Sequence, residues 1–236
     1  MAYSLVLPFH QDLTSIARTA RRARAEGGGH GVGEVVLAHN GLALSPEKQA
    51  TVDALVMPAG SGAPEVRFVH TDRKGLGAGY KLGILEAREE HVILSADDLP
   101  FGWTDLLAFE KAGKPDFAIG SKAHPDSNVQ GVTMLRQVST SVFRALRVLV
   151  LGRSTPQDSQ GSLIIRTDVA KRLVPDMRYD DYLASLELAT IHLFGGGEVV
   201  EVPVRLEHEP HPSSVSVFRD GSRMARGLLE LRSRRR

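Results

Sequence analysis

Two adjacent carboxylates follow a short apolar segment of the chain. In residues 91–100, HVILSADDLP, an apolar run ends in Asp97, Asp98 and a proline. Ligands of an open parallel sheet gather at the carboxyl ends of its strands, so these carboxylates are expected at the rim of a crevice. Two carboxylates suit a hard cation such as Mg²⁺ or Mn²⁺, which commonly bridges nucleotide phosphates. The pair predicts either such a metal site or, if a helix begins directly after it, an N-terminal helix cap.

A strand must end just before these carboxylates, and the surrounding patterns predict a sheet that contains it. Apolar runs alternate with segments of helical periodicity, which indicates βαβ units and an α/β, mostly parallel (mixed) sheet flanked by helices, Rossmann-like in its N-terminal half. We expect one domain over residues 1–236. Strands are expected at 4–8, 34–41, 66–70, 92–95, 116–121, 163–166 and within 195–209, and helices at 13–25, 45–56, 80–87, 104–112, 137–151, 182–193 and 219–236.

Composition excludes several classes of chemistry. The chain has no cysteine, so it has no disulfide, thiolate zinc site or thiol nucleophile. Lys and Arg number 29 against 28 Asp and Glu, a balance that gives no sign of nucleic-acid binding. The N-terminus lacks the pattern of a signal peptide and no apolar run is long enough to span a membrane, so we expect a cytoplasmic protein.

Five segments, in order along residues 4–232, resemble the dolichyl-phosphate-mannose-synthase branch of glycosyltransferase family 2. RKGLGAGYKLG (73–83) is similar to the family's KGLGxAY segment, and SADDL follows it as the family's DAD metal motif does. The other four segments are LVLPFHQD, EVVLAHNG, DSQGSLIIRTDVAKRL and the segment that runs from EVPVRLEHE to LELR. The resemblance implies a GT-A fold, a nucleotide-sugar donor, Mg²⁺ or Mn²⁺, and transfer of a hexose or N-acetylhexosamine, usually with inversion.

The same resemblance assigns roles to individual residues. Asp98 aligns with the metal-binding Asp of the family, where a cation stabilises the leaving diphosphate. Arg73 and Lys74 are placed to meet phosphate charge, and the glycines of the loop would let the backbone approach the nucleotide. The residues assigned to the donor are Pro8, His10, Asp12, His39, Asn40, Lys74, Gly75, Gly77 and Asp97.

The chain also departs from the family pattern. Ala96 stands where the family has the first Asp of its metal motif, so Asp97 is the substitute ligand. His39 replaces the base-binding Asp and Gln11 the Asn of the opening motif, which leaves the UDP- or GDP-linked identity of the donor open. His208 is a candidate to complete the metal shell, with an ordinary loop histidine as the alternative.

Acceptor-side chemistry points to two further carboxylates. Asp158 lies in the region where the family places acceptor-side residues, and Glu187 aligns with a helix Glu. Either could serve as general base for a hydroxyl acceptor, whereas a lipid phosphate is already anionic and needs none. The alternatives are a surface turn for Asp158 and a solvated or partner-bonded helix residue for Glu187.

The predictions also cover the acceptor, contact with a membrane, the oligomeric state and the rival functions. The resemblance implies that residues 1–121 bind the nucleotide-sugar and the metal and that residues 122–236 form the acceptor half. The acceptor is a polyprenyl phosphate or a soluble small molecule. The basic amphipathic segment from Arg219 onward either contacts the anionic inner face of a membrane or packs on the domain. A homodimer is kept open. The rival functions are a non-catalytic sugar-nucleotide-binding protein and a nucleotidyltransferase, although the latter is expected to carry a Gly-rich loop where this chain has PFHQD.

Overall fold

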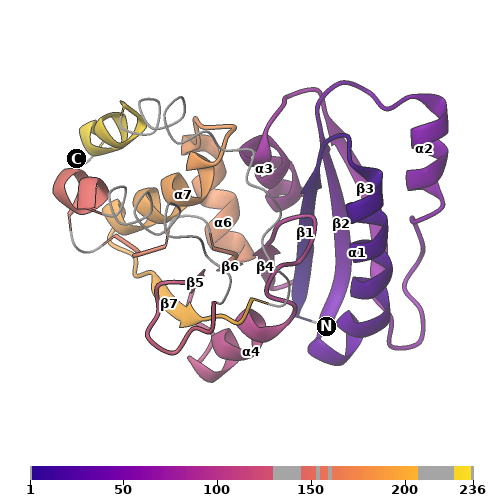
Figure 1. Ribbon diagram of the computed structural model, residues 1–236, viewed down its shortest axis with the longest axis horizontal. Coiled ribbons are helices and arrows are strands. Elements are labelled where there is room, and N and C mark those ends of the chain that lie inside the picture. Colours follow the sequence, from indigo (N-terminus) through magenta and orange to yellow (C-terminus); the bar gives the residue numbers. More distant parts are fainter. Residues whose placement is uncertain (1, 130–144, 153–154, 159–160, 207–225, 235–236) are drawn as a thin grey trace.

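The strands form one seven-stranded sheet that spans both halves of the chain. The computed structural model describes residues 2–129, 145–152, 155–158, 161–206 and 226–234. Within these residues the strand order is β3-β2-β1-β4-β6-β5-β7 (Figure 1). The strands are β1 (Tyr3–Phe9), β2 (Val32–Asn40), β3 (Glu65–Thr71), β4 (His91–Leu94), β5 (Phe117–Ser121), β6 (Leu163–Arg166) and β7 (Val200–Pro203).

The sheet is parallel except at one strand. β1 to β4 all run in the same direction, and β6 is antiparallel to both β4 and β5. β7 then pairs in parallel with β5. The carboxyl ends of β1, β2, β3 and β4 therefore meet at one edge of the sheet, and the mixed, mostly parallel sheet expected from the sequence is confirmed.

Helices cover both faces of the sheet. They are α1 (Leu13–Glu26), α2 (Pro46–Asp53), α3 (Leu76–Glu86), α4 (Thr104–Lys111), α6 (Thr167–Leu173) and α7 (Leu183–Phe194), with short 3₁₀ turns η1 (Gly27–His30) and η2 (Val174–Asp176) and helical residues at 145–151 and 226–233. Local sequence explains two of the starts: Asp12 caps α1 by accepting from the amides of Thr14 and Ser15, and Ser45 caps α2 just before its proline.

Alternation along each buried strand builds two cores. Leu5 and Leu7 of β1 face α1 and α4 in one cluster, whereas Val6 faces α3 in the other. Side chains of a strand point alternately to its two faces, so a strand that is apolar throughout needs helices on both sides. This double burial fixes the register that places the strand ends at a common edge.

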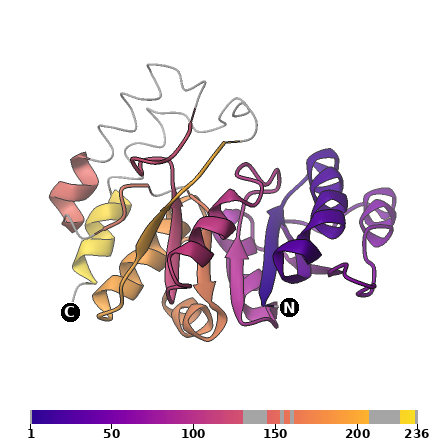
Figure 2. The same ribbon diagram turned by 90° about the horizontal axis from the view of Figure 1, so that it is seen from below.

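One helix of the structure was not predicted from the sequence, and part of the helix predicted at the C-terminus lies outside the described residues. α6 follows β6 directly, and its seven residues had not been assigned. The helical residues 226–233 pack onto residues 145–151 and α7 through Leu228 and Leu231 (Figure 2), which supports packing for this part of the tail. Residues 137–144 and 219–225, which were expected to be helical, are not among the described residues. No helix in the described part is long and apolar enough to cross a membrane.

Candidate functional site

The acidic pair lies in a turn at the carboxyl end of β4. The turn is closed by a hydrogen bond of 3.1 Å from the amide of Leu99 to the carbonyl of Ala96, and Leu99 has a positive φ of 48°. α4 begins only at Thr104, and no side chain caps it. The helix-cap interpretation of the pair is therefore wrong, because the carboxylates stand more than a helical turn before the helix.

The two carboxylates have different surroundings. Asp98 is half-buried and has no hydrogen-bond or ion-pair partner within the described residues. Asp97 lies close enough to the buried Tyr80 to act on its pKa. Burial is the main reason that the pKa of Tyr80 is raised, its hydrogen bond with Ser185 opposes the rise, and the charge of Asp97 adds to it. Asp97 thus lies near Tyr80, and Asp98 is the carboxylate without a partner in the described part of the chain.

The glycine-rich loop presents two cations with different roles. Arg73 donates to the Asp180 carboxylate from Nε at 3.0 Å and from Nη2 at 2.5 Å. Lys81 binds the other oxygen of Asp180 at 2.8 Å. Burial raises the pKa of Asp180, but the hydrogen bonds from Lys81 and Arg73 outweigh it and lower the pKa. Lys74 is exposed and has no such partner in the part of the chain that the structure describes.

Close packing explains why the loop needs glycines, and the sequence did not reveal this packing. Gly75, with φ 123°, has the carbonyl of Asp180 where a Cβ would be, and its amide donates to Asn40 Oδ1 at 3.3 Å. A Cβ on Gly77 would lie 2.5 Å from the Tyr179 carbonyl. These glycines therefore let the loop pack closely against residues 179–180. Contact of Gly75 and Gly77 with the nucleotide stays a prediction.

Three histidine rings stack at the ends of β1, β2 and β3. His39 is fully buried, with its ring centroid 5.0 Å from that of His70 and 6.2 Å from that of His10. Neither ring nitrogen of His39 has a partner among the described residues. Burial, followed by the neighbouring His70, lowers the pKa of His39, so its ring is neutral near pH 7.

Two of these histidines bind the turn after β2. His10 Nδ1 lies 2.6 Å from the carbonyl of Asn40, and His70 Nε2 lies 2.8 Å from the carbonyl of Gly41. The predicted base-side residues His10, His39 and Asn40 are thus brought together. His39, Asn40 and Gly41 are buried, whereas His10 is half-buried and is the most exposed of these four residues.

Two other predicted donor residues have structural contacts. Pro8 is buried in β1, and its Cβ is 2.6 Å from where a Cβ on Gly79 would stand, so it supports the approach of α3 to the sheet. Asp12 is the N-cap of α1. Their contact with a donor is untested.

The two acceptor-side carboxylates are both engaged. Asp158 Oδ2 accepts from the Lys122 amide at 2.9 Å and lies 3.3 Å from the Lys122 ammonium. Glu187 is fully buried, accepts from the amides of Arg178 and Tyr179 at 2.9 Å each, and lies 2.6 Å from Arg234 Nη1. The partner-bonded interpretation of Glu187 is therefore correct, and its proposed use as a base must be corrected because both of its oxygens hold protein groups.

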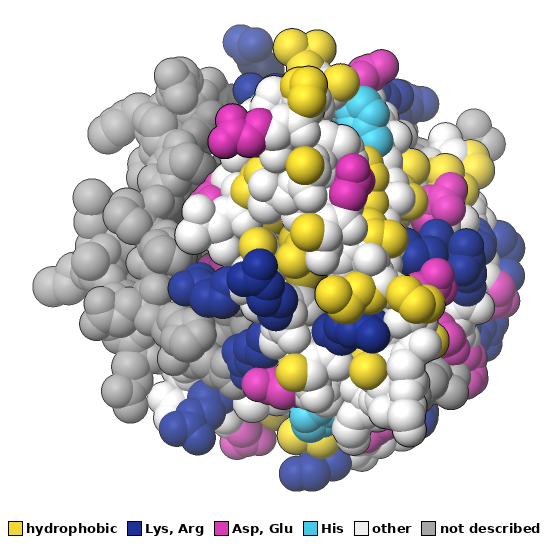
Figure 3. Space-filling model, turned by 90° about the vertical axis from the view of Figure 1, so that its right-hand side faces the viewer, with side chains coloured by type: hydrophobic (Ala, Val, Ile, Leu, Met, Phe, Trp, Pro, Cys, Tyr) yellow, Lys and Arg dark blue, Asp and Glu magenta, His cyan; other side chains and the backbone are white. Residues whose placement is uncertain are grey.

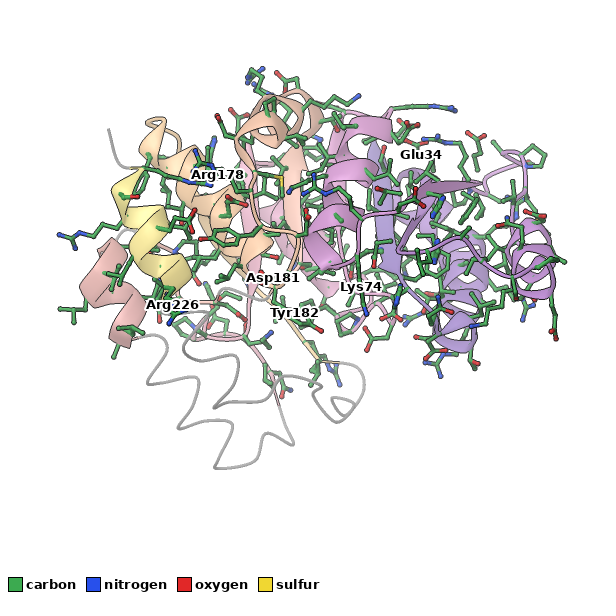
Figure 4. The ribbon with its side chains drawn as sticks, turned by 90° about the horizontal axis from the view of Figure 1, so that it is seen from above. Glu34, Lys74, Arg178, Asp181, Tyr182 and Arg226 are labelled. Atoms are coloured by element: carbon green, nitrogen blue, oxygen red, sulfur yellow. The ribbon has the colours of Figure 1, made fainter. Side chains whose placement is uncertain are left out.

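Sequence reasoning missed a second acidic pair, Asp180 and Asp181. Their segment precedes α7, and the Gly77 amide donates to the Asp180 carbonyl at 2.8 Å, which joins the glycine loop to the second half of the chain. Seen from above, Asp181 and Tyr182 lie near Lys74, whereas Glu34 lies apart (Figure 4). Two adjacent acids directly before a helix in RYDDYL were the available signal.

The residues that could hold a metal are Asp98 and Asp97. No group of three or more His, Asp or Glu arranged to hold a metal occurs in the described ranges. His208 lies outside those ranges. Two carboxylates still suit Mg²⁺, which usually takes one or two protein carboxylates and completes its shell with water and substrate phosphates.

Comparisons with solved structures show the fold. Glucosyl-3-phosphoglycerate synthase from Mycobacterium tuberculosis, in complex with uridine diphosphate, matches with a TM-score of 0.58 and 14% identity over 99% of this chain and 79% of its own. S. aureus TarS 1–349 matches with a TM-score of 0.50 and 13% identity, over 97% and 65%. CMP:2-keto-3-deoxy-manno-octonic acid synthetase, complexed with CTP, also gives 0.50 and 13%, over 98% and 100%.

These likenesses define the class of fold. The chain has a GT-A fold, with the mostly parallel, helix-flanked sheet expected from the sequence. At the level of sequence, neither a family model nor a curated protein matches it.

Proposed function

We propose that this protein is a metal-dependent glycosyltransferase that moves a hexose or N-acetylhexosamine from a nucleoside-diphosphate sugar. One observation carries the proposal: within the described residues, the carboxylate of Asp98 and the ammonium of Lys74 have no protein partner and follow parallel strands that end at the same edge. A diphosphate with its bound cation would give both charges a partner. The uridine diphosphate bound to the M. tuberculosis enzyme is consistent with this.

Each residue at this edge has a task in the proposed reaction. Asp98, assisted by Asp97, would hold Mg²⁺ or Mn²⁺, which when bound neutralises charge that builds on the leaving diphosphate. Lys74 would bind a phosphate oxygen. The Asn40–Gly41 turn, held by His10 and His70, would lie on the nucleobase side. Whether the base is uracil or guanine is left to measurement.

The acceptor is a lipid phosphate or a soluble hydroxyl compound. A lipid phosphate, the acceptor in the dolichyl-phosphate-mannose-synthase-like branch, would need no base. For a hydroxyl the candidate bases are Asp158, which is paired with Lys122, and Asp181, which accepts from the Leu183 amide at 2.9 Å and follows the residue that binds the glycine loop. Direct displacement with inversion, peripheral membrane contact and a homodimer belong to the same proposal.

A nucleotidyltransferase is the second candidate. The synthetase complexed with CTP supports it, since that structure matches 98% of this chain with a TM-score of 0.50, against 0.58 for glucosyl-3-phosphoglycerate synthase. Against it, β1 runs directly into PFHQD, without the glycines that a triphosphate-cradling loop requires.

The deciding experiment is isothermal titration of nucleoside diphosphates and their sugars, with and without Mn²⁺, on the wild type and Asp98→Asn. We expect one nucleotide to bind only with metal, and Asp98→Asn to weaken it on the order of a hundredfold, the scale of a lost metal contact. Asp53→Asn, which changes an exposed carboxylate on α2, is the control and should bind normally. Binding of no nucleotide by folded protein would sink the proposal. Release of pyrophosphate from a nucleoside triphosphate and a sugar phosphate would establish the nucleotidyltransferase instead.

A further inference from the structure

A groove runs between α1 and the segment from α2 to β3, on the side of the molecule away from the acceptor half. It consists of a cavity of about 540 Å³ beside α2 and an adjoining cavity of about 420 Å³ beside residues 54–66, and Arg21 lines both. Volumes of this size are typical of small-molecule sites. Figure 3 looks onto this side, where Lys and Arg side chains gather next to apolar ones.

The first cavity is cationic. Arg18, Arg21 and Lys48 line it, against one carboxylate, Glu47. Arg18 and Arg21 have no hydrogen bond or ion pair with any described residue. Lys48 donates to the neutral Gln11 carboxamide at 2.7 Å, so its charge is not compensated either. The excess of two positive charges matches one phosphate monoester, which carries roughly −1.5 to −2 at pH 7.

The second cavity is lined mostly by small and apolar residues, together with two arginines. Arg24 there donates to the carbonyls of Pro58 and Pro64 at 3.0 and 2.7 Å, so its guanidinium is held by the backbone. The remaining lining offers mostly methyl and methylene groups, with one serine and one glycine among them: Ala20, Ala25, Ala54, Leu55, Met57, Ser61, Gly62, Ala63 and Val66. Met57 is 43% exposed, so a ligand that covers it gains from removing apolar surface from water.

We propose that this groove binds a phosphate monoester of an apolar chain. The phosphate lies between Arg18, Arg21 and Lys48, and the chain lies along the apolar cavity past Arg21. Arginine suits this task because its planar fork can hold two phosphate oxygens at once. The site is separate from the proposed donor site, whose phosphate-binding side chain is Lys74 beyond β3.

The test is isothermal titration with n-octyl phosphate below its micelle concentration, in parallel with inorganic phosphate. We expect octyl phosphate to bind at least about tenfold more tightly than inorganic phosphate, because a buried CH₂ contributes about 0.8 kcal/mol. Arg18→Ala with Arg21→Ala should weaken both ligands by about tenfold or more, the scale of one lost charge-assisted hydrogen bond. Met57→Ser should weaken octyl phosphate only.

Matched variants locate the binding. Arg22→Ala removes a charge from the same helix, but Arg22 pairs with Glu26 at 2.9 Å and does not line the groove, so binding should be unchanged. Lys74→Ala should also leave it unchanged. Binding lost in Lys74→Ala and kept in the Arg18/Arg21 variant would overturn the proposal in favour of the donor edge. Equal affinity for the two phosphates would overturn it as well. So would sedimentation with phosphatidic-acid vesicles combined with no binding of octyl phosphate, because that result assigns the arginines to a membrane surface.

Discussion

The two edges of the parallel sheet treat charge in opposite ways. At the amino edge, Glu34 is 2% exposed, accepts from Ser4 at 2.6 Å and from the Arg88 amide at 2.7 Å, and lies 2.7 Å from Arg67. At the carboxyl edge, the structure describes no protein partner for Asp98 or Lys74. Both edges carry acids and bases, but Glu34 at the amino edge is held by several partners, whereas Asp98 and Lys74 at the carboxyl edge have none among the described residues.

This difference separates charges that stabilise the fold from charges that await a ligand. A buried carboxylate without partners is costly, so Glu34 needs every one of its hydrogen bonds. A half-buried carboxylate such as Asp98 keeps contact with water, so it does not carry the cost of a fully buried carboxylate without partners. The comparison therefore assigns stability to the amino edge and ligand binding to the carboxyl edge, and each assignment can be tested alone.

The largest effect is expected at the amino edge. Glu34→Ala leaves Arg67, whose side chain is 12% exposed, without its closest carboxylate, and should lower the free energy of unfolding by roughly 3–5 kcal/mol. Urea denaturation followed by circular dichroism measures this. A double variant, Glu34→Leu with Arg67→Met, should recover much of the loss because no buried charge is left unpaired. If Glu34→Ala unfolded at the wild-type urea concentration, the network would not contribute to stability.

A smaller effect should separate two neighbouring cations of the glycine loop. Lys74→Met should weaken nucleoside-diphosphate binding about tenfold, as expected for one hydrogen bond to a charged group. Arg73→Met removes the same charge one residue away, but Arg73 is engaged with Asp180, and so affinity should stay within a factor of about three. Titration of both variants with the same nucleotide gives the ratio, and equal losses would contradict the distinction between paired and unpaired cations.

Much of the fold could be predicted because the central strands are mostly apolar and two of the helices have a capping residue at their start. β6 was predicted to the residue, and Asp12 and Ser45 mark the starts of α1 and α2. α6 was missed because it is short and begins directly after β6, with no loop between them. A loop between two elements is the sequence signal that marks where one ends and the next begins, and no loop separates β6 from α6.

The site was harder to predict, because partners come from distant segments. The sequence does not distinguish Arg73 from Lys74. Asp180, 107 residues from Arg73, pairs with Arg73, whereas Lys74 has no partner in the part of the chain that the structure describes. Likewise, Gly77 resembles a nucleotide-binding glycine until the Tyr179 carbonyl appears beside it. Residue type and spacing located the edge of the sheet, whereas the pairing at that edge depends on tertiary contacts.

The smallest effect concerns pH and bears on both edges. Burial lowers the pKa values of His39 at the carboxyl edge and His91 at the amino edge, and also that of His192. Below an unfolded-state pKa of about 6.5 the unfolded chain takes up protons that the folded chain resists, so stability must fall as the pH falls through that value. Above it all three rings are neutral in both states and stability should be flat with respect to these groups.

The variant His39→Phe isolates the carboxyl edge, since it keeps an aromatic ring between Phe9 and His70 and removes the titration. Its unfolding free energy, measured by urea denaturation from pH 7.5 to pH 5.5, should fall less steeply than that of the wild type. Because His10 and His70 still hold the Asn40–Gly41 turn, nucleotide affinity at pH 7.5 should be retained. A pH slope identical to that of the wild type would mean that His39 is protonated in the folded protein without cost, and that the histidine stack tolerates charge.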